Sequence, residues 1–207
     1  MIVVSSKFAK LIIMGVILVG HAFFSGCRSS EYYYYRAFER SRTTDYKGAI
    51  ADLDKAINAD SEKWYYFALR GHIEYLTGAN QRAIEDLNKA LELNSSVAIV
   101  LLERGKVSIA LGDYHSATSD LDRSIETDPG NGLSYIYRGY AKYMGGQMEE
   151  GLEDLDKAVE LWPYGEADLI RGMARIGHGD YLGGLQDLFA GIRKKQEHTL
   201  TTRSGIP

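Results

Sequence analysis

Charged side chains recur in this sequence at a fixed spacing that could serve chemistry. Five arginines each stand sixteen positions before an aspartate, and the pairs are Arg36–Asp52, Arg70–Asp86, Arg104–Asp120, Arg138–Asp154 and Arg171–Asp187. Catalytic groups act together at one site, whereas these pairs form five equivalent copies. An Arg–Asp pair is directional and can be bidentate, which suits a link between packed segments. We therefore interpret the pairs as structural.

The sequence shows none of the usual spacings of metal-binding or nucleophilic groups. The five histidines form no HExxH-like pattern, and they are His21, His72, His115, His178 and His198. No serine lies in a strand–turn–helix elbow, and one cysteine falls short of the roughly four ligands of a zinc site. The sequence thus predicts a protein that is not an enzyme and that uses no metal and no cofactor.

The N-terminal residues have the order of a secretory signal. MIVVSSKFAK carries Lys7 and Lys10 and no acidic residue, and an apolar run follows over residues 11–24. That run is shorter than the about 20 residues of a transmembrane helix. Two small residues, Ser25 and Gly26, come next. A basic region, an apolar core and a small-residue cleavage site together predict a signal peptide over residues 1–26.

Cys27, the single cysteine of the chain, comes directly after this segment. The stretch FSGC resembles the lipobox of bacterial lipoproteins. The resemblance implies that Cys27 carries a diacylglycerol on its sulfur, becomes the first residue after cleavage, and is then N-acylated. Two other interpretations stay open, which are ordinary cleavage after Ala22 and an uncleaved anchor. Arg28 rather than an aspartate follows the cysteine, which favours the outer membrane.

The rest of the chain repeats itself at steps of thirty-four positions, with thirty-three at the last step. A small residue follows each repeated arginine, and we call this the close-packing position: Ala37, Gly71, Gly105, Gly139 and Gly172. Seven positions later stands a glycine, or Thr44 in the first copy, and sixteen positions later always a leucine. Apolar residues at helical spacing lie on both sides of that glycine. Each unit is therefore predicted to be a helix, a short turn and a second helix.

Segments such as RGHIEYLTGANQRAIEDLNKALEL and RGYAKYMGGQMEEGLEDLDKAVELWP resemble tetratricopeptide repeats. The resemblance implies an all-α, right-handed α-solenoid with five such repeats over residues 31–196, in which the helix pairs bury their apolar faces against one another. A short linker would occupy residues 27–30 and a polar tail residues 197–207. The fifth repeat departs most, because Asp168 replaces an apolar residue of the other copies.

The resemblance also implies that the first helix of each repeat lines a concave groove. Carried over to this chain, the stripe lies six and three positions before, and one position after, the close-packing position. The predicted partner-binding groove is Tyr34, Phe38, Tyr65, His72, Ile99, Leu102, Lys106, Leu133, Ile136 and Tyr140. An exposed apolar strip of this kind marks a partner site. Tight closure of the superhelix, or filling by the chain's own tail, would bury it instead.

The function predicted from these features is a non-enzymatic scaffold or adaptor. It would be lipid-anchored in a bacterial cell envelope, on the periplasmic face, and would hold a helical or extended segment of a partner protein. The mildly acidic chain, with a formal net charge of −4, argues against nucleic acid. The alternative is a self-associating structural lipoprotein. KKQEHTLTTRSGIP is too polar and irregular to predict a clear capping helix, so the last repeat could pair with another copy.

Overall fold

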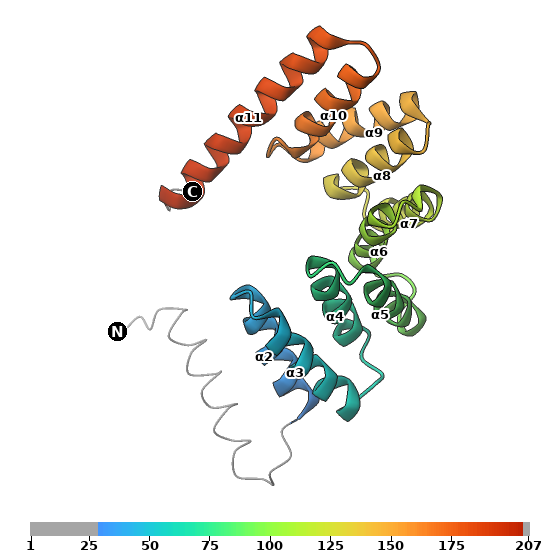
Figure 1. The fold of residues 1–207 in the computed structure, drawn as a ribbon, viewed down its shortest axis with the longest axis vertical. Coiled ribbons are helices and arrows are strands. Elements are labelled where there is room, and N and C mark those ends of the chain that lie inside the picture. Colours follow the sequence, from blue (N-terminus) through green and yellow to red (C-terminus); the bar gives the residue numbers. More distant parts are fainter. Residues whose placement is uncertain (1–28, 205–207) are drawn as a thin grey trace, which may run out of the picture.

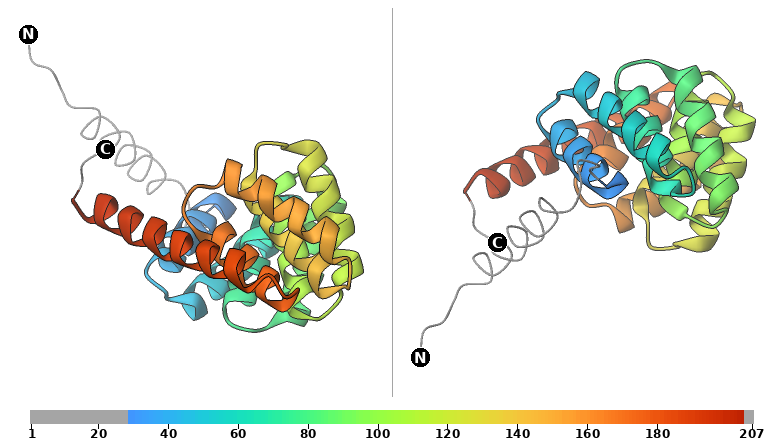
Figure 2. Two further views of the ribbon diagram at one scale, coloured as in Figure 1. Left: turned by 90° about the horizontal axis from the view of Figure 1, so that it is seen from above. Right: turned by 90° about the horizontal axis from the view of Figure 1, so that it is seen from below.

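The computed structural model describes residues 29–204, and this part of the chain contains ten α-helices and no strand. They pair as α2 (Ser30–Arg42) with α3 (Tyr46–Ala59), α4 (Trp64–Leu76) with α5 (Asn80–Leu93), α6 (Ala98–Ala110) with α7 (Tyr114–Thr127), α8 (Gly132–Met144) with α9 (Met148–Leu161), and α10 (Glu166–Gly177) with α11 (Tyr181–Ser204). The five pairs stack in chain order into a curved row (Figures 1 and 2). The predicted all-α solenoid is confirmed.

The turn inside each repeat depends on one residue in the left-handed conformation. The residue seven positions after the close-packing position has a positive φ in all five repeats, at Thr44, Gly78, Gly112, Gly146 and Gly179. Glycine adopts this conformation without steric cost, whereas a β-branched residue does not. Thr44, with φ 62°, is therefore the strained copy.

The close-packing position brings the two helices of a repeat into contact. A Cβ atom added at Gly105 would lie 2.9 Å from Cγ of Leu121, and one added at Gly139 would lie 2.8 Å from the carbonyl oxygen of Gly151. Both distances are below normal van der Waals contact. Small residues are required here because larger ones would push the helices apart.

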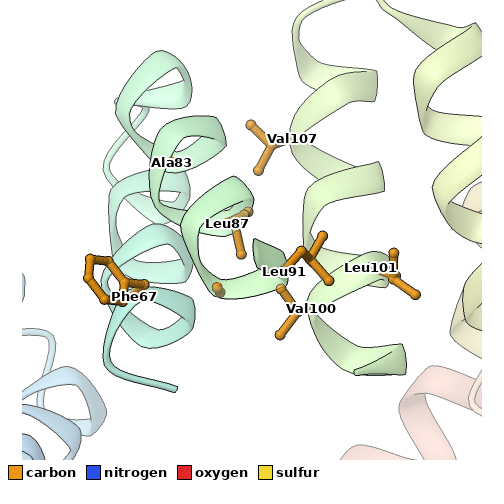
Figure 3. Close-up of a cluster of buried hydrophobic side chains, with 8 residues drawn as sticks. Phe67, Ala83, Leu87, Leu91, Val100, Leu101 and Val107 are labelled. Atoms are coloured by element: carbon orange, nitrogen blue, oxygen red, sulfur yellow. The ribbon is translucent and has the colours of Figure 1, made fainter. Parts of the chain in front are cut away.

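Apolar side chains from two consecutive repeats form each section of the core. In one such cluster, Leu87 of α5 packs with Phe67 of α4 and with Val100 and Val107 of α6 (Figure 3). The repeated leucine, sixteen positions after the close-packing position, is fully buried in the first four repeats. Leu188, its counterpart in α11, is only partly buried, because no further helix pair packs on it among the described residues.

The repeated arginines link helices in two directions. Each bonds the aspartate of its own repeat through Nε and Nη2, as Arg104 does with Asp120 at 2.7 and 2.6 Å. From the second repeat on, Nη1 also reaches back to the second helix of the preceding repeat, as from Arg104 to Asn88 at 2.7 Å. Arg70, Arg138 and Arg171 make the same backward bond to an aspartate. The pairs are structural links both within and between repeats.

A third charged residue joins this link in most repeats. Three positions after the close-packing position, Arg40, Lys142 and Arg175 contact the same aspartate at 2.9 to 3.1 Å. In the second repeat that place holds Glu74, which is 4% exposed and adjoins Asp86. Oε2 of Glu74 has no hydrogen-bond partner. Burial, and then the Asp86 charge, raise the pKa of Glu74 to about 7.

The fifth repeat differs because its second helix is longer than the others. Asp168 is buried, and Nζ of Lys194 donates to both of its carboxylate oxygens at 2.8 Å. Lys194 lies in α11, which continues to Ser204 and is 24 residues long, whereas the other second helices have 14. The sequence predicted no clear capping helix from KKQEHTLTTRSGIP, yet residues 197–204 are helical as the end of α11. The ion pair holds the middle of α11 against α10.

Candidate functional site

The inner side of the curved row is formed by the first helices of the repeats. Consecutive first helices contact one another from α2 through α4, α6 and α8 to α10, whereas consecutive second helices among the described residues do not. The first helices accordingly lie on the inside of the curve in Figure 1. Side chains that point away from the second helices therefore face the space that the curve surrounds.

Exposed apolar side chains mark this inner face. They lie six and two positions before the close-packing position, and one and five positions after it. These four positions share one face of a helix and form a single stripe. Phe38, Ile99 and Met173 are 44, 51 and 58% exposed. The remaining large exposed apolar residues of the stripe are Tyr35, Leu76 and Met144. We call these six residues the inner stripe.

The predicted groove residues differ in their exposure. Phe38 and Ile99 are exposed on the inner face, while six predicted residues are partly exposed: Tyr34, Tyr65, His72, Lys106, Leu133 and Tyr140. Leu102 and Ile136 are only 1 and 2% exposed, so their assignment to the groove is wrong. Leu102 packs against Leu121 of its own repeat and Ala141 of the next, because its position points between adjacent repeats.

A charged cluster occupies the middle of the inner face. Glu103 of α6 accepts from Nζ of Lys106 at 2.8 Å, and its other oxygen lies 2.8 Å from Nδ1 of His72 on α4. Nζ of Lys106 also lies 5.4 Å from the ring centre of Tyr75 and 5.7 Å from that of Tyr137. Burial alone would raise the pKa of Glu103, but the bonds from His72 and Lys106 outweigh it and keep that pKa below its usual value.

The cluster changes what the inner face can bind. Lys106 is already paired with Glu103, and both side chains are mostly buried. Lys106 is therefore not a free cation for a carboxylate of a partner. The exposed side chains of the inner face are mostly apolar and aromatic. They surround a cluster in which the charges of Glu103 and Lys106 neutralise each other.

Aromatic side chains dominate the N-terminal end of the inner face. The ring of Tyr34 meets the rings of Tyr65 and Tyr66 at 5.0 and 5.3 Å. The hydroxyl of Tyr65 donates to Glu31 at 2.5 Å, which together with burial raises the pKa of Tyr65. This network fixes α2 against α4. It leaves Tyr35 and Phe38 as the exposed aromatic surface of the first repeat.

Sequence reasoning missed the position two places before the close-packing position. It holds Tyr35, Leu69, Glu103, Tyr137 and Ile170, all at least partly exposed. One available signal was the spacing of Glu103 and Lys106, which are three positions apart and so share a helix face. The pairing of Glu103 with His72 joins two repeats, and no local pattern indicates it.

The described residues support neither a metal site nor a membrane-spanning helix. Between residues 29 and 204, no group of histidine, cysteine, aspartate or glutamate side chains has the arrangement to hold a metal ion. None of the helices in that range is long and apolar enough to cross a membrane. Cys27 and the predicted signal peptide lie outside the described residues, so the lipidation site stays a prediction.

Comparisons with known proteins agree with this geometry. The family model of the tetratricopeptide repeat matches residues 102–166. The fold is a tetratricopeptide repeat solenoid. Among solved structures, MamA 41-end from Desulfovibrio magneticus RS-1 superposes on this solenoid with a TM-score of 0.73 at 18% identity, covering 84% of this chain and 98% of that one. No curated protein matches the sequence.

Two further solved structures share the tetratricopeptide repeat fold. YrrB, a TPR protein with an unusual peptide-binding site, has a TM-score of 0.64 at 20% identity, over 84% of this chain and 90% of its own. PilF of Pseudomonas aeruginosa has a TM-score of 0.71 at 17% identity, over 80% of this chain and 76% of its own. At such low identity the likeness establishes the fold alone.

Proposed function

We propose that this protein is a non-enzymatic adaptor that holds a segment of another protein against its inner stripe. The observation that carries the proposal is the exposure of Phe38, Ile99 and Met173 on alternate first helices, at positions on the helix face away from the second helices. Large apolar side chains gathered in one concave surface favour association with a partner. YrrB, with the same fold, has a peptide-binding site.

The partner segment is expected to be apolar or aromatic and to carry little charge. Each square ångström of apolar surface that it buries contributes about 25 cal/mol. Ordering of the segment offsets much of that gain, so we expect micromolar affinity for an isolated peptide. Ile99, near the middle of the face, is the anchor that we expect to matter most, since central apolar contacts dominate such interfaces.

Photo-cross-linking in cells that make the full-length chain tests this proposal. The photoreactive residue p-benzoylphenylalanine replaces Phe38 and, in a second experiment, Leu111, which is an equally exposed apolar residue away from the inner stripe. We expect a defined protein cross-linked at position 38 and not at 111. Ile99→Asp should remove that cross-link, and Leu111→Asp should leave it in place.

The same cross-linked protein at both positions, or a cross-link that survives Ile99→Asp, would show that recognition lies elsewhere. Asn88→Lys, which would add a charge on the outer face, is not a suitable control. Asn88 accepts a 2.7 Å hydrogen bond from Arg104, and a lysine would place a second cation beside that arginine. Thermal unfolding of each variant, followed by circular dichroism, separates lost binding from lost folding.

We also propose that the adaptor is anchored through a lipid on Cys27 to the periplasmic face of a bacterial envelope membrane. The proposal rests on the FSGC stretch after a signal-like segment. Cys27→Ser should release the protein from membranes or leave an unprocessed precursor. Metabolic labelling with a radioactive fatty acid provides the matching test. A variant that fractionates, migrates and labels like the wild type overturns the anchor and leaves the adaptor proposal intact.

A further inference from the structure

The last helix, α11, has a second apolar face that packs on nothing in the described structure. One side of α11, with Asp187, Gly191 and Lys194, faces α10. At about 100° per residue, six large apolar side chains lie within an arc of about 100° on the other side. They are between 47 and 71% exposed, and we call them the α11 face: Tyr181, Leu182, Leu185, Phe189, Ile192 and Leu200.

Part of this face occupies the positions where other repeats bind their successor. Leu185 and Ile192 lie thirteen and twenty positions after the close-packing position. The equivalent residues of the second repeat, Ile84 and Leu91, are partly or fully buried against the neighbouring core. The last repeat thus keeps an apolar docking surface, and in Figure 1 the outer side of α11 is the free end of the row.

Phe189 shows that this surface is not made for another repeat of the same kind. The equivalent residues of the earlier repeats are Asp54, Asn88, Asp122 and Asp156, which accept the backward hydrogen bond from the next arginine. Phe189 has no acceptor, so a following tetratricopeptide repeat of the same kind would leave its arginine without that link. The α11 face therefore differs from the surface on which the earlier repeats stack.

The size and composition of the α11 face suit packing against the α11 face of a second copy. A large apolar side chain presents on the order of 200 Å² when fully exposed. Six of them exposed by about half or more offer roughly 700 Å², close to the roughly 800 Å² that each partner contributes to a standard stable interface. The helix is about 36 Å long, and the arc contains no acidic side chain that would repel its own copy. Such an apolar surface can pack against the same surface of a second copy that is related to it by a two-fold axis.

We infer that the α11 face is a dimer interface, on which a second copy of this chain packs its own α11 across a two-fold axis. An antiparallel arrangement places the two helix dipoles in favourable opposition. The inner stripe stays open in such a dimer, since it belongs to the first helices. Two copies would thus present two inner faces, and dimerisation neither requires nor prevents partner binding there.

Photo-cross-linking of the full-length chain in cells tests the dimer. The reporter p-benzoylphenylalanine replaces Leu182, and the cross-linked peptides are identified by mass spectrometry. We expect a peptide that joins two α11 segments. Phe189→Asp should abolish it, because a carboxylate would enter the apolar contact. The fold should tolerate this change, since three other repeats carry aspartate at the equivalent place. Phe189→Asn, the residue type of the second repeat, is the second variant.

Leu111→Asp is the matched control, because it adds a carboxylate at an exposed leucine outside α11. The α11–α11 peptide should persist in that variant. Absence of any self-cross-link from position 182, a cross-link to another protein or to lipid instead, or a self-cross-link that survives both Phe189 variants overturns the proposal. Cross-links from position 38 report on the inner stripe separately, so the two proposals fail independently.

Discussion

Glu74 should make the stability of this protein depend on pH in a way that one substitution removes. Its carboxyl lies where three other repeats place a cation, beside Asp86 and almost fully buried. The pKa of Glu74 rises from 4.5 to about 7 on folding. Between these two pH values the folded state binds more protons than the unfolded state, so the free energy of unfolding falls as the pH rises. The contribution of Glu74 to the free energy of unfolding is therefore most favourable below pH 4.5, and this advantage is fully lost above about pH 7.

The size of the pKa shift gives the free energy that is involved. One pKa unit corresponds to about 1.4 kcal/mol, so the shift at Glu74 amounts to roughly 3 kcal/mol at neutral pH. Glu74→Gln keeps the shape and removes the charge, and it should recover most of that free energy above pH 7 and almost none at pH 4. Glu74→Lys should stabilise as well, because it reproduces the contact that Lys142 makes with Asp154 at 2.9 Å.

Urea unfolding of wild type and variants at a series of pH values between 4 and 8 measures these differences. Subtracting the two profiles cancels the other groups that titrate in this range. Glu85→Gln, which removes an exposed carboxylate on α5, is the control and should change stability by less than about 0.5 kcal/mol at each pH. Parallel profiles for wild type and Glu74→Gln would refute the argument, since they would show that Glu74 titrates alike in both states.

Three further tests by substitution concern other parts of the fold. Thr44→Gly should raise the free energy of unfolding by about 1 kcal/mol and Gly112→Thr should lower it by at least as much, because both positions need a positive φ; equal melting temperatures would contradict this. Gly105→Leu should cost about 1–3 kcal/mol or more by overpacking a contact that already leaves no room for a Cβ, and an unchanged melting temperature is the contrary result. Lys194→Met should cost about 3–5 kcal/mol in urea unfolding by leaving Asp168 buried and unpaired, and Asp168→Leu in the same chain should restore most of it; no recovery would show that the ion pair is not the cause.

The sequence predicted the repeat architecture because each repeat is specified by local requirements in five copies. A positive φ at Gly78 and Gly112 favours glycine, and the close approach at Gly105 excludes large side chains. These constraints act within a single helix pair, so periodicity alone is enough to find them. The interpretation of the Arg–Asp pairs as structural is supported for the same reason, since each pair lies inside one repeat.

Only the tertiary structure decided which side chains face the inside of the curve. The sequence placed Leu102 and Ile136 there, but the angle at which successive repeats stack turns them into the core. That angle depends on contacts between repeats, such as the bond from Arg104 to Asn88, which no pattern within one repeat encodes. The same holds for the pairing of Glu103 with His72 across two helices.

The C-terminal helix shows the same division. Its residues are polar enough in sequence to predict an irregular tail, because a helix pattern is judged by one apolar face. In the folded chain, Lys194 pairs with Asp168 and α11 continues beyond this pair to Ser204, while the apolar side chains of the α11 face stay exposed on the opposite side. Sequence determined the repeating unit, whereas the ends and the inner surface of the solenoid depend on what packs beside each unit in space.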